Sequence, residues 1–356
     1  MTSSSNKELV YFKKWVSPVG DEVIATRPDI KTVKLEYSDP DEKIWAAFQT
    51  ATGYHCLPRT ESEPRWFPSA ALLARAPRLL ACSSAGAGYD VIDVAACTAA
   101  GVLVVNQSGT NKEAVAEHVL GFMLTMSKKI SYWDREMRRR PNVDRFNPQG
   151  HDIGGKTVGI IGIGHIGGRV AQLCGGILGM PILAYDPYLS ADQIRAKGAT
   201  KVELDELLSR ADFVSINCPH SKETEGMFGA AQFARMRPEA YFITTARGPV
   251  HDEKALVEAL KSNRIAGAGI DVWHTEPPPI DHPLMACENA VLTPHMAGIT
   301  FEATDNAAGA GARQWMTIFD GQVPPRLVNP EVWPLYSKRF EAIMGFKPAP
   351  LASGSA

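Results

Sequence analysis

The sequence predicts an α/β protein built around a parallel sheet with helices on both faces. Between about residue 100 and residue 295, short apolar segments typical of buried strands alternate with segments in which charged and apolar residues recur at helical spacing. This alternation is typical of β-α-β units. One junction between strand and helix carries the glycine-rich sequence GIIGIGHIGG, residues 159–168. We therefore expect a doubly wound sheet with a glycine turn at its carboxyl edge.

The composition is that of a globular protein that can bury a large core. The 356 residues include 45% hydrophobic and 21% charged side chains, a length that favours about two domains. Lysine and arginine total 37 against 39 aspartate and glutamate residues, so no overall basic charge indicates binding to nucleic acid or to an anionic membrane. We interpret the basic run 138–140 as the exposed end of a helix.

The amino-terminal segment and the cysteines indicate the cellular environment. No apolar stretch there has signal-peptide length, and no segment approaches the roughly 18 apolar residues of a membrane span. We therefore expect a cytoplasmic protein. The cysteines lack the spacing of zinc sites, so we expect no metal site and reduced, mostly buried thiols. They are Cys56, Cys82, Cys97, Cys174, Cys218 and Cys287.

The individual elements follow from the residue types along the chain. Segments rich in β-branched and aromatic residues predict strands at 9–16, 32–37, 78–84, 102–105, 157–162, 181–186, 213–217, 241–245, 267–272 and 290–294. Helical spacing of apolar residues predicts helices at 70–76, 110–139, 167–177, 204–208, 253–261 and 301–321. The polar end, residues 352–356, is expected to be disordered.

The glycine turn is expected to bind the pyrophosphate of a dinucleotide. Gly162, Gly164 and Gly167 follow a strand and open a helix, where glycines permit a tight turn and let the pyrophosphate approach the helix amides. Asp186, 24 residues after Gly162, ends the next strand and can accept hydrogen bonds from ribose hydroxyls. The alternative interpretation is a packing turn followed by an exposed aspartate.

Asp186 also indicates which dinucleotide binds. A carboxylate at this position repels a 2′-phosphate, and the following Pro187 and Tyr188 supply no cation that would replace it. We therefore expect NAD rather than NADP.

Three ionisable residues follow later strands at the same edge of the sheet. They are Arg247, Glu276 and His295. Hydride transfer to a 2-keto acid needs a cation for the carboxylate or carbonyl, a proton donor that titrates near neutral pH, and a group that keeps this donor charged. Arginine, histidine and glutamate are the matching types. Taken singly, the three could also be a surface cation, an exposed loop acid and a packed loop histidine.

Six segments resemble, in order, the motifs of the D-isomer-specific 2-hydroxyacid dehydrogenase family. They are residues 81–106, 109–124, 155–171, 244–260, 271–277 and 292–298, within a similarity that runs from about Pro77 to about Ala310. The resemblance implies a Rossmann-type NAD-binding domain at 107–296, inserted into a smaller flavodoxin-like α/β substrate domain made of residues 1–106 and 297–356. It thereby explains why the glycine turn lies in the middle of the chain.

The resemblance also implies a role for each site residue. Arg247 would anchor the substrate through its carboxylate and carbonyl, His295 would be the acid/base, and Glu276 would favour the imidazolium form of His295. The backbone amides of Ala87 and Gly88 would receive the substrate carboxylate. The implied cofactor contacts are His165 and Ile166 over the pyrophosphate, Cys218 and Pro219 near the adenine, Thr245 and Ala246 under the nicotinamide half, and Asp271 near the nicotinamide amide.

Two functions are compatible with these residues. The first is an NAD-dependent oxidoreductase that interconverts a 2-keto acid and a D-2-hydroxy acid, with glyoxylate, hydroxypyruvate or a larger analogue as substrate. The second is a dinucleotide-sensing binding protein, because the resemblance also covers the carboxy-terminal-binding-protein corepressors. The lack of a long disordered extension argues against the second. The segment after residue 321 is expected to be too short for the regulatory domain of long phosphoglycerate dehydrogenases.

Specificity and assembly are expected to depend on segments outside these motifs. Substrate determinants are expected around residues 54–59 and 66–67, and His220 and His274 are two extra imidazoles close to the site in sequence. We also expect a homodimer, because the predicted helix 110–139 carries an apolar stripe. The alternative is that this stripe packs within its own subunit. Its members are Val115, Val119, Phe122, Met123 and Met126.

Overall fold

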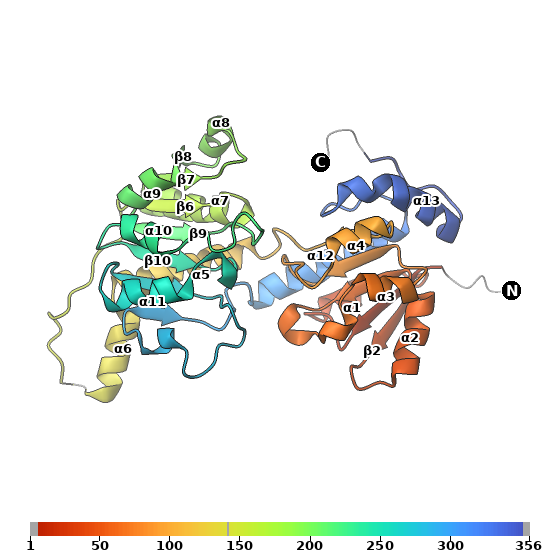
Figure 1. The fold of residues 1–356 in the computed structure, drawn as a ribbon, viewed down its shortest axis with the longest axis horizontal. Helices are drawn as coiled ribbons and strands as arrows, with labels where there is room; N and C mark the ends of the chain where they lie inside the picture. Colours follow the sequence, from red (N-terminus) through yellow and green to blue (C-terminus); the bar gives the residue numbers. More distant parts are fainter. Residues whose placement is uncertain (1–5, 141, 352–356) are drawn as a thin grey trace. The chain divides into compact units, whose positions relative to one another are not determined.

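The computed structural model of the protein describes residues 6–140 and 142–351. The chain divides into two compact units, each with its own sheet (Figure 1). Unit 1 comprises Met1–Asn111 together with Phe301–Ala356, and unit 2 comprises Lys112–Thr300. The tail predicted to be disordered, residues 352–356, lies outside the described residues.

Unit 2 is built on a seven-stranded sheet in the order β12-β11-β10-β9-β6-β7-β8, with all pairs parallel. Its first strand, β6, lies inside the sheet, and the strand order reverses between β6 and β9, which is where open α/β sheets bind their ligands. The prediction of a doubly wound parallel sheet is therefore confirmed. The strands are β6 (Val158–Ile161), β7 (Ile182–Tyr185), β8 (Thr200–Lys201), β9 (Phe213–Ile216), β10 (Tyr241–Thr244), β11 (Gly267–Ile270) and β12 (Ala290–Leu292).

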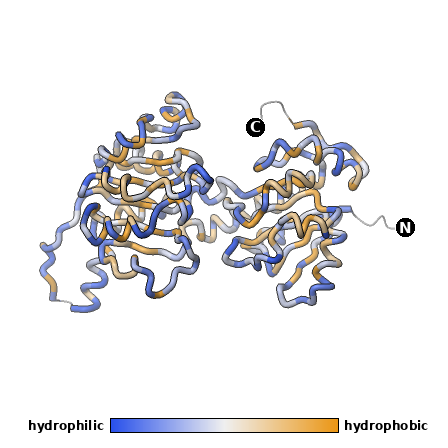
Figure 2. The backbone as a smooth tube through the Cα atoms, in the orientation of Figure 1, coloured by the Kyte–Doolittle hydropathy of each residue, from blue (hydrophilic) through white to orange (hydrophobic). Residues whose placement is uncertain are grey.

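The strands of unit 2 are apolar because helices cover both faces of the sheet. Every residue of β6, β9, β10 and β11 is buried, and the apolar segments run through the interior of the unit (Figure 2). The helices are α5 (Lys112–Ser127), α6 (Ile130–Arg139), α7 (His165–Ala171), which continues into the π-helical turn Gln172–Ile177, α8 (Ala191–Arg195), α9 (Leu204–Arg210), α10 (Ala230–Arg235) and α11 (Glu253–Lys261). Short 3-10 turns lie at Gly248–Val250 and Pro283–Ala286.

The single long helix predicted at 110–139 is wrong, because the chain turns between α5 and α6. Lys129 has a φ of 56°, in the left-handed region that ends a helix. The hydroxyl of Ser127 donates to the carbonyl of His151, and the Ser127 carbonyl accepts the amide of His151. This break was missed because serine and lysine both fit a helical pattern, whereas the partner residue is distant in sequence.

The apolar stripe of this segment packs inside unit 2. Val115, Val119, Phe122, Met123 and Met126 are all buried, and α5 packs against α7, β10, β11 and β12. Gly269 in β11 makes room for the ring of Phe122, since a Cβ there would lie 2.6 Å from Phe122 Cγ. The inference of a dimer from this stripe is therefore wrong.

Unit 1 contains a five-stranded parallel sheet in the order β2-β1-β3-β4-β5, the strand order of flavodoxin-like folds. The two-domain α/β prediction is thus confirmed. Its strands are β1 (Glu8–Phe12), β2 (Lys31–Leu35), β3 (Gly53–Cys56), β4 (Ala81–Ser84) and β5 (Leu103–Val105). Its helices are α1 (Val19–Ala25), α2 (Asp41–Thr50), α3 (Ala70–Arg75), α4 (Val94–Ala99), α12 (Phe301–Phe319) and α13 (Trp333–Met344), with 3-10 turns at Arg59–Glu61, Pro64–Trp66 and Pro330–Val332.

Several elements of unit 1 differ from the prediction, which did not include α1, α2, β3 or α4. The strand predicted at 9–16 ends at Phe12, because Lys13 adopts a left-handed conformation with a φ of 57°. The helix 301–321 was expected to be the last, but α13 follows it and buries Trp333, Tyr336 and Phe340. The prolines around Trp333 give this segment a sequence typical of a loop. Pro334, however, occupies the first turn of α13, where proline is tolerated.

Candidate active site

The glycine turn after β6 requires glycine for steric reasons. Gly162 has a φ of 82°, and a Cβ there would lie 2.8 Å from the backbone nitrogen of Cys218. A Cβ on Gly167 would lie 2.2 Å from the carbonyl oxygen of Gly162. Gly164 immediately precedes α7, and a Cβ there would meet no atom within 4 Å, so the space before the helix is open. The turn thus fits a pyrophosphate at the start of α7, whose first residues are His165 and Ile166.

Asp186 is fixed beside this turn. Its Oδ2 accepts the amide of Ile163 at 3.1 Å and its Oδ1 accepts the amide of Tyr188 at 3.1 Å, while the residue is only 9% exposed. The Tyr188 hydroxyl donates to Glu223, so a second carboxylate lies close to this end of β7. Cys218 and Pro219 follow the neighbouring strand β9, and Cys218 contacts the turn at Gly162.

His295 and Glu276 form a pair, although 19 residues separate them in sequence. The Nδ1 atom of His295 lies 2.7 Å from Oε2 of Glu276. The other carboxylate oxygen, Oε1, accepts the amide of Trp273 at 3.1 Å. Since Nδ1 faces a carboxylate, it carries a hydrogen and donates it, which leaves Nε2 to exchange a proton with a substrate. The side chains are 37% and 21% exposed, so the pair is accessible.

The surroundings of Glu276 keep it ionised. Partial burial by itself raises the pKa of Glu276, but the hydrogen bond from His295 and the positive charge of that ring outweigh this effect. The Trp273 amide and the charge of Arg247 act in the same direction, so the pKa of this carboxyl lies below its ordinary value. A negative charge therefore stands beside His295 throughout the neutral pH range.

Arg247 is held near this pair by the chain that follows β10. Its Nη1 donates to the carbonyl of Ala246 at 2.7 Å. The next residue, Gly248, packs so closely on the segment that leads to Glu276 that a Cβ would lie 2.1 Å from the carbonyl oxygen of Trp273. Thr245 is buried and Ala246 is partly buried at the end of the strand. The strands β10, β11 and β12 thus bring all three predicted catalytic residues to one edge of unit 2.

Asp271 is buried, and its carboxylate accepts hydrogen bonds from other groups of the protein. It is 1% exposed, and it accepts the hydroxyl of Thr293 together with the amides of Met296 and Ala297. These partners flank His295. The contact with the nicotinamide amide stays a prediction, while the structure gives this carboxylate a role in holding the loop of His295, which the sequence did not indicate.

In unit 1, the predicted carboxylate loop follows β4. Asn106 Nδ2 donates to the carbonyl of Ala87 at 2.7 Å, and the Ser84 hydroxyl donates to the carbonyl of Gly88. The amide of Gln107 donates to the carbonyl of Gly86 at 2.9 Å. These three bonds fix the carbonyls of the loop. Asn106 and Ser84 were not among the predicted site residues, because their loop partners are visible only in the fold.

The segments expected to carry substrate determinants are only partly exposed. Tyr54, His55, Cys56, Leu57 and Trp66 are buried in unit 1, and the role of residues 54–59 and 66–67 in specificity stays a prediction. Arg59, in contrast, is exposed and pairs with Asp90 at 2.8 Å.

The two extra histidines differ in their surroundings. His220 is exposed in the loop after β9. The Nε2 atom of His274 lies 2.7 Å from the carbonyl oxygen of His251, and the His274 amide donates to Glu253 at 2.9 Å. His274 is therefore tied to the chain that begins α11.

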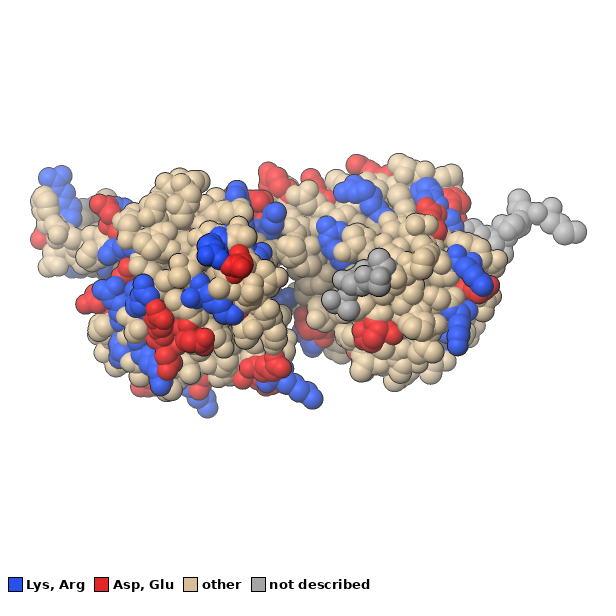
Figure 3. All heavy atoms as spheres, turned by 90° about the horizontal axis from the view of Figure 1, so that it is seen from above, with Lys and Arg blue, Asp and Glu red and all other residues tan. Residues whose placement is uncertain are grey.

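Other features of the described residues limit the kinds of site. Five of the six cysteines are buried, as predicted. Over the ranges 6–140 and 142–351, no cluster of three or more His, Cys, Asp or Glu side chains could hold a metal, and no helix is long and apolar enough to cross a membrane. Figure 3 shows acidic and basic side chains interspersed on one face of the molecule.

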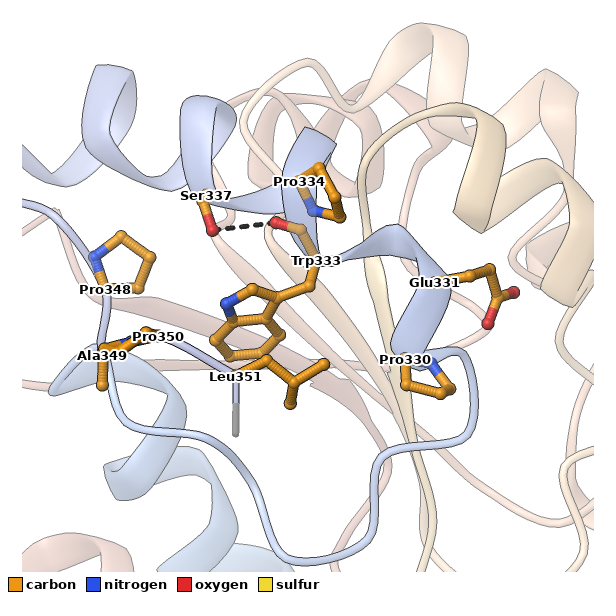
Figure 4. Close-up of a pocket in the computed structure, with 9 residues that line it drawn as sticks. All are labelled: Pro330, Glu331, Trp333, Pro334, Ser337, Pro348, Ala349, Pro350 and Leu351. Carbon is orange, nitrogen blue, oxygen red and sulfur yellow. Dashed lines mark hydrogen bonds between the residues drawn. The ribbon is translucent and has the colours of Figure 1, made fainter. Parts of the chain in front are cut away.

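A shallow, open pocket of about 560 Å³ lies in unit 1 beside α13. The indole of Trp333 lines it together with the segment Pro348–Leu351, and the Ser337 hydroxyl donates to the Trp333 carbonyl (Figure 4). The pocket shares no residue with the predicted site.

The fold and the site define a dinucleotide-binding α/β protein with an ionisable triad at the carboxyl edge of its seven-stranded sheet. Residues 120–297 match the model of the NAD binding domain of the D-isomer specific 2-hydroxyacid dehydrogenases. The chain belongs to this family, and unit 2 contains its NAD-binding domain.

Named relatives agree with this assignment. A glyoxylate reductase of Korarchaeum cryptofilum is 38% identical over 260 residues, which cover 72% of this chain and 78% of the relative. A D-3-phosphoglycerate dehydrogenase of Archaeoglobus fulgidus is 37% identical over 278 residues, or 78% of this chain and 52% of the relative. The chain thus spans about half the length of the D-3-phosphoglycerate dehydrogenases it matches.

A solved structure extends the similarity to both units. The D-lactate dehydrogenase of Aquifex aeolicus, in complex with NAD and lactic acid, is 26% identical with a TM-score of 0.76, over 90% of this chain and 98% of that chain. The relatives named above are dehydrogenases and a reductase, and the corepressor-like alternative has no support among them.

Proposed function

We propose that the protein is an NAD-dependent oxidoreductase that interconverts a small 2-keto acid and a D-2-hydroxy acid. The observation that carries this proposal is the 2.7 Å pair of His295 and Glu276 beside Arg247, in the same unit as the nucleotide turn. A proton donor, its charge partner and a cation are the groups that reduction of a keto acid requires.

In the proposed mechanism, each member of the triad has one task. NADH, when held by the glycine turn and Asp186, would supply the hydride for C2 of the keto acid. His295 donates the proton on Nε2 to the carbonyl oxygen as negative charge develops there, and Glu276 stabilises the imidazolium before the transfer. Arg247 binds the carboxylate and polarises the carbonyl. In the oxidation direction, neutral His295 accepts the hydroxyl proton.

We also propose that the backbone amides of Ala87 and Gly88, in unit 1, bind the substrate carboxylate. The carbonyls of Ala87 and Gly88 are held by Asn106 and Ser84, which fixes the backbone whose amides would bind the carboxylate. In this proposal residues 1–106 and 297–356 form the substrate domain, and residues 107–296 form the NAD-binding domain. Relatives named glyoxylate reductase and glyoxylate/hydroxypyruvate reductase support a short 2-keto acid as the substrate.

We also propose that NAD is preferred over NADP and that the protein is a cytoplasmic homodimer. Asp186, held by two backbone amides, supports the cofactor preference, because its negative charge opposes a 2′-phosphate. Exposed apolar side chains support the dimer: Ile130 and Met137 lie on α6, and Phe146 lies in the segment that follows it. In Figure 1, α6 lies at the periphery of unit 2.

The test is NADH oxidation with a panel that includes glyoxylate, hydroxypyruvate, pyruvate and larger 2-keto acids. We expect turnover with at least one of them and a D-2-hydroxy acid as product. His295→Ala is expected to lower kcat by about 100- to 10,000-fold while NADH still binds. Turnover of none of these acids by a protein that binds NADH would refute the proposal.

A further inference from the structure

A chain of hydrogen bonds connects helix α5 to the backbone around His295. On α5, Nε2 of His118 lies 3.1 Å from the hydroxyl oxygen of Thr293. That hydroxyl lies 2.6 Å from Oδ1 of Asp271. The carboxylate of Asp271 in turn accepts the amide of Met296 at 2.8 Å and the amide of Ala297 at 2.9 Å.

The chemistry of these groups decides which one donates and which one accepts in each hydrogen bond. An ionised carboxylate only accepts hydrogen bonds, so the Thr293 hydroxyl donates its single hydrogen to Asp271. The same oxygen must therefore accept from His118, which carries a hydrogen on Nε2. Burial lowers the pKa of His118, and the charge of Asp271 opposes this only in part. A neutral ring with its hydrogen on Nε2 serves as the donor.

The backbone at His295 needs such support. Its φ is 57°, in the left-handed region that side chains with a Cβ rarely adopt. The two amides held by Asp271 belong to the next two residues, Met296 and Ala297. On the preceding side, the carbonyl of Thr293 accepts the indole Nε1 of Trp273 at 3.0 Å. His295 is thus held on both sides in the conformation that pairs it with Glu276.

We propose that His118 is a positioning residue of the active site, which acts through Thr293 and Asp271 to fix the backbone of residues 295–297 and so to direct Nε2 of His295. In the absence of the His118 donor, the Thr293 hydroxyl oxygen loses a partner in a half-buried site. The hydroxyl can then rotate away from Asp271. The kinetic part of the inference rests on the proposed function, whereas the effect on the backbone does not.

The simpler role for His118 would be packing. Its ring contacts Phe122 edge-on, with centroids 4.6 Å apart. A packing role and a hydrogen-bonding role respond differently to substitution. Thr293→Val removes the hydroxyl at nearly constant volume, and Thr293→Ser keeps it. His118→Phe keeps a ring without a donor, and His118→Gln keeps a donor without a ring.

The first experiment measures amide hydrogen exchange in the protein without cofactor. We expect the amides of Met296 and Ala297 to exchange at least about tenfold faster in Thr293→Val and His118→Phe than in wild type, because bonds to Asp271 protect them. Thr293→Ser and His118→Gln are expected to recover most of the protection. His151→Phe, at an exposed histidine of the same unit, is the control that should leave exchange unchanged.

The second experiment measures reduction of the best keto acid from the panel. We expect Thr293→Val and His118→Phe to lower kcat by about 10- to 100-fold with KM for the keto acid within about twofold, because a displaced proton donor acts in the transition state. The solvent deuterium isotope effect on kcat should rise, and the two conservative variants should recover most of the lost kcat.

The two experiments separate the possible failures. Unchanged exchange in both Thr293→Val and His118→Phe would overturn the positioning role, whatever the activity. Equal losses of exchange protection in His118→Phe and His118→Gln, with wild-type exchange in Thr293→Val, would assign His118 to packing. If wild type turned over no keto acid, the proposed function would fail, and the exchange experiment would still decide the role of His118.

Discussion

Replacing Glu276 by glutamine removes the charge beside His295 and retains the shape of the side chain. A charge-assisted hydrogen bond contributes about 1.5–3 kcal/mol, against about 0.5–1.5 kcal/mol for a neutral one. Both side chains remain partly exposed, at 37% and 21%, which weakens the interaction. We therefore expect the pair of His295 and residue 276 to lose about 1 kcal/mol of interaction in Glu276→Gln.

The sign of the expected change follows from the direction of proton transfer. Reduction requires protonated His295, so its rate falls on the alkaline side of the pH profile. Without the Glu276 charge, this alkaline limb should move to lower pH by about 0.5–1 unit. The maximal kcat should also fall, because an amide can accept from His295 or from Trp273 with its single oxygen, whereas the carboxylate accepts from both.

The assay is the pH dependence of kcat for keto-acid reduction at saturating NADH. Glu239→Gln, at an exposed carboxylate of the same unit, serves as the control and should leave the profile unchanged. An alkaline limb that stays in place or moves to higher pH in Glu276→Gln would refute the reasoning, even if the variant lost activity.

The pH dependence of stability in wild type follows from the lowered pKa of Glu276. The ion pair contributes to the stability of the fold above the ordinary carboxyl pKa, and this contribution is lost as the pH falls through the lowered pKa.

Three further predictions concern the cofactor, the substrate and the assembly. Asp186→Asn, which removes the charge and keeps the side-chain size, should raise the ratio of kcat/KM for NADPH to that for NADH at least about tenfold, and an unchanged ratio would place Asp186 away from the ribose. Arg247→Ala should raise KM for the keto acid and lower kcat, because a carboxylate anchor acts in the ground state and the transition state together, whereas a change in kcat alone would contradict an anchoring role. Met137→Glu on α6 should shift a dimer towards monomer in sedimentation velocity at micromolar concentration, and a wild-type monomer under these conditions would refute the dimer.

The sequence alone determined the class of fold and the strand ends that carry the candidate catalytic residues. Strand and helix periodicity is a local property, so it revealed the parallel sheet of unit 2. The glycine turn was equally visible, because the left-handed φ of Gly162 and the close approach of Gly167 to the Gly162 carbonyl arise within the turn itself. The contact of Gly162 with Cys218, in contrast, comes from the fold. Since the carboxyl ends of parallel strands meet at one edge, three ionisable residues that follow strands were expected to lie close together, as Arg247, Glu276 and His295 do.

Only the tertiary structure decided what each side chain contacts. The five apolar residues of α5 pack inside their own unit, because β10–β12 lie against that helix, and no pattern on a single helix reveals its partner. Asp271 follows a strand, as a ligand residue would, yet its carboxylate turns inward to the amides beside His295. Both the packing of α5 and the hydrogen bonds of Asp271 depend on residues more than 20 positions away in sequence. Local spacing carries no information about them, so they are settled only when the chain is packed.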